Sequence, residues 1–158
     1  VVAIMFILGG VAIIAIERWA KRSDIVGVAE MPVSTAVGIG IAQCLAMVPG
    51  VSRSGATIMG ALSLGVERRT AAEFSFFLAI PTMLGATTLE FVKHRHEILA
   101  GAHGVGFGTV AVGFVVSFAA AIVVVRAFVH YISRHGFAPF AWYRIVVGAA
   151  ALAWLFAR

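Results

Sequence analysis

The sequence predicts an all-α integral membrane protein, a polytopic bundle whose helices cross the membrane several times. Of its 158 residues, 61% are hydrophobic and 12% are charged, whereas about 25% of the residues of a soluble domain are charged. The mean hydropathy is +1.03. Because one spanning helix takes roughly 20 apolar residues, the chain has room for about four or five such segments. We expect a single transmembrane domain over residues 1–158.

The charged residues lie in short clusters between the apolar runs. The formal net charge is +5, and its main basic clusters are at 17–22, 67–69 and 93–97. Such clusters are typical of loops at a membrane surface, so the charge does not indicate a nucleic-acid partner. The chain has one cysteine, Cys44, which excludes a disulfide framework and a CxxC metal or redox motif.

The uninterrupted apolar runs predict spanning helices at 1–16, 71–92, 105–130 and 139–157. The first run ends at Glu17 and the two residues after it, a charged and aromatic edge that marks a membrane interface. We expect Pro81 to kink the second helix. Polar connections are expected at 17–33 and in the stretch "KHRHEILAGAHGVG", which begins at Lys93.

A further apolar run, 34–66, is divided by Pro49 and Gly50. At about 1.5 Å per residue, neither piece is long enough to span a bilayer core of about 30 Å. Proline disfavours helix for the residue before it and glycine tolerates unusual dihedrals, so the first half-helix should end near Met47. Ser52 has the position of an N-cap for the second. The run therefore predicts a broken, re-entrant helix hairpin.

The polar residues after the break form a candidate oxyanion site. The first amides of a helix have no intrahelical partner, and the helix dipole there favours negative charge, so a phosphate fits this end. Arg53 adds a charged fork that can bind phosphate oxygens, and Ser52, Ser54 and Thr57 add hydroxyl donors. Thr57 follows Arg53 by four residues and lies on the same helical face.

Other interpretations of these residues are weaker. A single serine or threonine in a membrane commonly satisfies a backbone carbonyl, and a lone arginine can reach the headgroups, but neither explains the whole cluster. The stretch "GVSRSGAT" has Ala56 where a P-loop requires lysine. A lipid-phosphatase pattern that begins Ser-Arg requires a histidine, and positions 54–66 contain none.

The segment "AQCLAMVPGVSRSGATIMGALSLG" resembles the second signature of the undecaprenyl-diphosphatase (bacitracin-resistance) family, Pro-Gly-x-Ser-Arg-Ser-x-x-Thr. Residues 68–86 and 137–148 resemble later helices of the same family, so the resemblance covers nearly the whole chain. It implies a multi-pass enzyme of the bacterial cytoplasmic (inner) membrane. Such an enzyme hydrolyses undecaprenyl diphosphate to undecaprenyl phosphate and phosphate, which recycles the lipid carrier for cell-wall synthesis.

The resemblance also implies roles for particular residues. Arg53, Ser52 and Thr57 would be catalytic, with Arg53 holding the diphosphate and stabilising charge during phosphoryl transfer. The substrate would be a long-chain prenyl diphosphate lipid. Its diphosphate would be bound by Gly50, Ser52, Arg53, Ser54, Gly55 and Thr57. A homo-oligomer is a further possible partner, besides the membrane itself.

A first signature of the family, paired glutamates followed by Ser-Ser and a histidine, is absent from these residues. The equivalent half-helix has Gln43 and Met47, neither of which binds a cation as a carboxylate does. In this family the amino-terminal half, which carries the first signature, resembles an inverted copy of the half that carries the second. We therefore expect this chain to be the carboxy-terminal portion of such an enzyme. The divalent cation that the resemblance implies, magnesium or calcium, would then have its ligands outside the chain, and the chain alone would be inactive.

Alternatives from other classes stay open at this point. A transporter or flippase for a phosphorylated lipid or a small anion could also use a broken half-helix to hold its substrate near the bilayer midplane. The interpretation as a purely structural membrane protein does not explain why a charged residue follows the helix cap in apolar surroundings.

Overall fold

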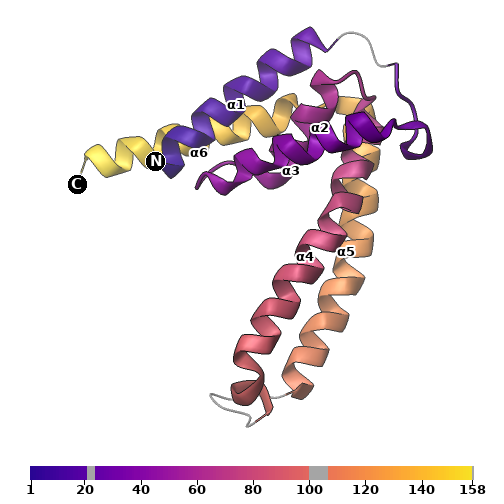
Figure 1. Cartoon of the computed structure of the whole chain (residues 1–158). Helices are drawn as coiled ribbons and strands as arrows, with labels where there is room; N and C mark the ends of the chain where they lie inside the picture. The colour runs from indigo at the N-terminus through magenta and orange to yellow at the C-terminus, as the bar shows by residue number, and fades with distance from the viewer. Residues whose placement is uncertain (21–23, 100–106, 158) are drawn as a thin grey trace. The chain divides into compact units, whose positions relative to one another are not determined.

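The computed structural model describes residues 1–20, 24–99 and 107–157, and these residues are mainly helical. Four helices, α1, α4, α5 and α6, are long and apolar enough to cross a membrane. The predicted all-α, multi-pass fold is confirmed. In the described residues the elements are, in order, α1 (Val2–Trp19), η1 (Val28–Glu30), α2 (Val33–Gln43), η2 (Cys44–Met47), α3 (Arg53–Ser63), α4 (Arg68–Leu99), α5 (Phe107–His135) and α6 (Ala138–Phe156) (Figure 1).

The helix α4 is longer than the sequence predicts. It begins at Arg68 rather than at 71 and continues to Leu99, so the first part of the expected connection that begins at Lys93 is helical. Local ion pairs suit this extension, because Glu90 lies 3.2 Å from Lys93 and 3.4 Å from His94, one helical turn away. The predicted connection from residue 100 onward lies outside the described residues.

The chain forms two compact units, and the candidate site lies in the first. The first unit contains Val1–Phe76 and His130–Arg158, and the second contains Phe77–Val129. In the second unit, Phe114 and Phe118 stack along one face of α5 with their ring centroids 6.4 Å apart. Both side chains are largely exposed, at 72% and 61%, as expected for a helix whose solvent is lipid.

In the first unit, α1 and α6 pack closely against each other. A Cβ added at Gly148 of α6 would lie 2.8 Å from the carbonyl oxygen of Ala3. One added at Gly10 of α1 would lie 2.8 Å from the carbonyl oxygen of Ala141. Small residues allow helix backbones to approach closely in a membrane, where apolar burial gives little drive for association.

Glu17 connects the end of α1 to the starts of α4 and α6. One of its carboxylate oxygens accepts a hydrogen bond of 2.9 Å from the amide of Phe137 and lies 3.3 Å from Nε of Arg68. The side chain is 13% exposed. Gly136 has φ +70°, and a Cβ added there would collide with the same carboxylate, so a side chain at that position would displace Glu17. The predicted interfacial edge thus also joins helices within the first unit.

Candidate anion-binding site

The break between η2 and α3 depends on Gly50. This residue has φ +97°, in the left-handed region that favours glycine. A Cβ at Gly50 would lie 2.8 Å from the carbonyl oxygen of Val2 and 2.9 Å from Cβ of Met5. The first half of the hairpin ends at Met47, as the sequence predicts. The second half ends at Ser63, slightly before the apolar run ends at residue 66. Dihedral angle and space both require glycine at the break.

Ser52 caps α3, as the sequence predicts. Its Oγ accepts a hydrogen bond of 3.2 Å from the amide of Gly55 and lies 3.2 Å from Oγ of Ser54. A Cβ at Gly55 would lie 3.2 Å from Cβ of Ser52, so a larger residue there would crowd the cap. The serine satisfies one of the orphan amides, and the other amides of the first turn remain directed along the helix axis.

Replacing Ser52 with alanine is expected to lower the free energy of unfolding by about 1 kcal/mol, because the amide of Gly55 loses its acceptor. The melting temperature in detergent measures this effect. Ser63→Ala is the matched control, since the Ser63 hydroxyl bonds the carbonyl of Met59 at the other end of the same helix. Equal melting temperatures for the Ser52 variant and the unmodified protein would show that the cap adds no stability.

Thr57 lies on the buried side of α3. Its side chain is fully buried, and Oγ1 lies 3.1 Å from the carbonyl oxygens of both Arg53 and Ser54. It also lies 2.7 Å from Oγ of Ser75, a residue of α4 that is 2% exposed. A hydroxyl has one proton, so if Thr57 donates to a helix carbonyl, Ser75 donates to Thr57. In this structure the Thr57 hydroxyl thus has protein partners, and its contacts connect the first turn of α3 to Ser75 of α4.

We expect Thr57→Val and Ser75→Ala each to lower the free energy of unfolding by about 1–3 kcal/mol, because each leaves a buried hydroxyl or carbonyl without its partner. The double variant should lose less than the sum of the two, since both changes remove one shared contact. Melting temperatures of the four proteins test this. Thr88→Val is the control, because its exposed hydroxyl bonds Leu84 within its own helix. Strictly additive losses would mean that the two hydroxyls do not interact.

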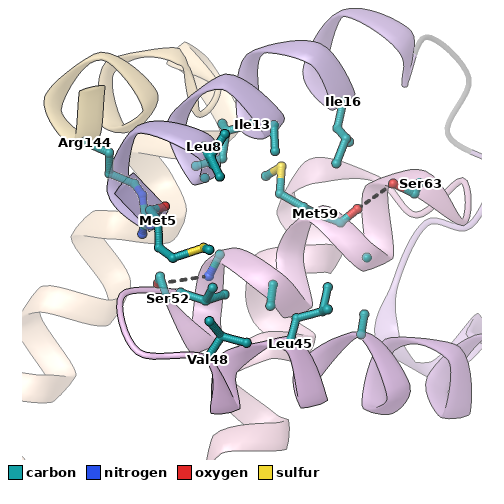
Figure 2. Close-up of a pocket in the computed structure, with 17 residues that line it drawn as sticks. Met5, Leu8, Ile13, Ile16, Leu45, Val48, Ser52, Met59, Ser63 and Arg144 are labelled. Carbon is teal, nitrogen blue, oxygen red and sulfur yellow. Dashed lines mark hydrogen bonds between the residues drawn. The ribbon is translucent and has the colours of Figure 1, made fainter. Parts of the chain in front are cut away.

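A pocket of about 450 Å³ lies between α1 and the hairpin, which consists of α2, η2 and α3. Figure 2 shows its walls, in which Leu8, Ile13 and Ile16 of α1 face Leu45, Val48 and Met59 of the hairpin. Its lining is otherwise small or apolar, apart from Ser52, Ser63 and Arg144. Of the residues predicted to bind diphosphate, Ser52 and Gly55 line this pocket. Gly50, Arg53, Ser54 and Thr57 lie around the same break but outside the lining.

Arg144, on α6, is not among the site residues that the sequence predicts. Its Nη2 donates to the carbonyl of Gly50 at 3.0 Å and to that of Met5 at 3.3 Å. The guanidinium lies 4.7 Å from the centre of the Phe6 ring, a cation–π contact. A signal was present, because a charged residue inside a predicted spanning helix is a candidate functional residue by default.

The described residues do not fit a divalent-cation site. They contain no group of three or more His, Cys, Asp or Glu side chains that could hold a metal ion. Gln43 offers one buried amide oxygen, Oε1, which has no hydrogen-bond partner in the described part of the chain. Magnesium and calcium require about six or more oxygen ligands. We therefore derive no step of the reaction through a metal bound by these residues.

Fold and site together define a multi-pass membrane protein that presents a capped helix N-terminus beside an apolar pocket. The chain belongs to the family described as bacitracin resistance protein BacA, whose profile matches residues 1–150. It is 62% identical over 158 residues to an undecaprenyl-diphosphatase of Novosphingobium aromaticivorans and 61% identical over 158 residues to one of Rhizorhabdus wittichii. Each alignment covers 100% of this chain and 58% of the relative. The family resemblance seen in the sequence is confirmed.

Proposed function

We propose that this chain forms part of an undecaprenyl-diphosphate phosphatase in the bacterial cytoplasmic (inner) membrane. The observation that carries the proposal is the N-terminus of α3, where Arg53 directly follows the Ser52 cap and Ser52 lines an apolar pocket. The relatives' names support hydrolysis rather than transport. Because the chain spans 58% of those relatives, the activity belongs to the complete protein.

The proposed substrate is an amphiphile with a charged head group and a hydrocarbon tail, and the site has a polar edge and apolar walls that suit these two parts. At one edge, Arg53 and the first-turn amides of α3 would bind the oxygens of the diphosphate, with Ser52 and Ser54 adding hydroxyl contacts. The apolar walls of the pocket would hold the hydrocarbon nearest the head group. The rest of a long prenyl chain would remain in the bilayer.

The reaction breaks the bond between the terminal phosphorus and the bridging oxygen. Water supplies the new oxygen on that phosphorus, and the products are phosphate and the lipid monophosphate. Arg53 would stabilise the charge that develops on the transferred group, and Thr57 would hold the turn that presents Arg53. The family resemblance implies a divalent cation, for which the described residues supply no set of carboxylate ligands.

Sealed proteoliposomes distinguish hydrolysis from transport. The protein expressed from its complete reading frame is supplied with labelled undecaprenyl diphosphate in the outer leaflet, and released phosphate and lipid translocation are measured together. The proposal predicts phosphate release. Translocation without phosphate release would instead favour a transporter or flippase. Both activities, with translocation surviving in a variant that cannot hydrolyse, would show a dual role. Cross-linking in the same vesicles would show whether the protein is a homo-oligomer.

A further inference from the structure

Arg144 carries a charge that the described residues do not neutralise. It lies within α6, a helix long and apolar enough to cross a membrane. The ion pairs of the described residues involve Glu17, Glu73 and Glu90, and Arg144 takes part in none of them. An arginine away from water is costly unless an anion or a hydrogen-bond acceptor compensates it. The position is therefore suited to an anionic ligand.

The hydrogen bonds of Arg144 leave part of its guanidinium unused. This group has five N–H donors, and both bonds to the described residues come from Nη2. Nε is buried and has no acceptor among the described residues. The two carbonyl contacts and the Phe6 ring fix the plane of the group without cancelling its charge. Nη1 makes no hydrogen bond to the described residues, and its two N–H groups can bind an oxyanion.

The surroundings accommodate this guanidinium specifically. A Cβ at Gly9 of α1 would lie 2.6 Å from Nη2, so glycine leaves the space that the group fills. Arg144 lines the same pocket as Ser52 and Gly55, and it bonds the carbonyl of Gly50, two residues before the cap of α3. The charge thus lies at the polar edge of the pocket (Figure 2).

We propose that Arg144 is a second anion-binding residue, which makes the site select a diphosphate over a monophosphate. The inference rests on the proposed function, because it takes the phosphorylated head group as the ligand. The N-terminus of α3 and Arg53 bind one phosphoryl group, and Arg144 binds an oxygen of the other. A monophosphate gains only the first set of contacts. The product of hydrolysis therefore binds more weakly than the substrate and is released.

The test compares the binding of two probes, sodium diphosphate and sodium orthophosphate, by calorimetry. The protein is expressed from its complete reading frame, as wild type and as Arg144→Gln, Arg144→Lys and Arg134→Gln. Arg144→Gln should weaken diphosphate binding by about tenfold to a hundredfold, as expected when a charged hydrogen bond is lost. Its orthophosphate affinity should change much less. Arg144→Lys should give an intermediate loss, because it keeps the charge without the planar fork. Arg134→Gln removes an exposed charge and should change neither affinity.

Two results would overturn the proposal. One is wild-type diphosphate affinity in both Arg144 variants, and the other is an equal loss for both probes, which is the result expected if Arg144 only braces the Gly50 loop. Melting temperatures show which variants fold, and if Arg144→Gln does not, Arg144→Lys decides by the same two criteria. A wild-type protein that binds diphosphate through Arg144 but releases no phosphate from a prenyl diphosphate would reject the proposed function while leaving this binding role intact.

Discussion

Arg53→Ala in the complete protein should lower kcat for phosphate release by about a hundredfold or more, the usual effect of removing a group that stabilises transition-state charge. Arg53 is the first residue of α3, directly after the Ser52 cap, so its position is set by the break. The loss should be larger in kcat than in the binding of substrate, because charge builds up on the transferred group during the reaction. Initial rates with undecaprenyl diphosphate in detergent measure both quantities.

Two further variants serve as controls for the Arg53→Ala experiment. Arg53→Lys should recover only part of the rate, because an ammonium is a point charge and cannot bind two oxygens in a plane. Arg134→Ala removes an exposed arginine from the end of α5 and should leave the rate unchanged. If Arg53→Ala folded and retained the wild-type rate, the assignment of the anion site to the start of α3 would be wrong.

Gly50→Ala should lower the free energy of unfolding by about 2–5 kcal/mol, the sum of left-handed strain and overpacking. The added methyl group would meet the backbone of Val2, which cannot move aside as a flexible side chain can. Because the Gly50 carbonyl also accepts from Arg144, any shift of the loop would disturb the polar edge of the pocket. We therefore expect a lower melting temperature together with a loss of phosphate release.

Gly40→Ala is the matched control for this change. Gly40 lies within α2, and a Cβ there would meet nothing within 4 Å. Alanine is favoured over glycine in a helix by about 1 kcal/mol, so this variant should be as stable as the wild type or more so. Equal behaviour of the two variants would show that the conformation at the break is not what the site depends on.

The features that the sequence predicts correctly are those whose causes are local. Pro49 and Gly50 interrupt a helix through their own backbone chemistry, and Ser52 caps the next helix by reaching three residues ahead. The apolar runs likewise specify spanning helices by composition. The predicted end of α4 is too early, because the charged stretch after Val92 has a composition typical of a surface loop. Its charges are instead spaced to pair along a continuing helix.

The contacts that the sequence does not predict join distant parts of the chain. Ser75 reaches Thr57 from another helix, and Arg144 reaches Gly50 across 94 positions. Neither pairing has a periodicity or a motif, since each depends on how α4 and α6 pack against the hairpin. The four-residue spacing predicts Thr57 on the helical face of Arg53, whereas in the structure its hydroxyl contacts Ser75 of α4. Local rules thus predict the helix break and its cap, and tertiary contacts define how the residues around the break are held.

The most direct test of the central claim is phosphate release from undecaprenyl diphosphate by the purified, complete protein in detergent, with and without a divalent cation. We expect cation-dependent release by the complete protein and none by residues 1–158 alone. A folded complete protein that releases no phosphate under either condition would contradict the proposed hydrolysis. Transport of the phosphorylated lipid would then be the better explanation of the polar residues at the break between η2 and α3.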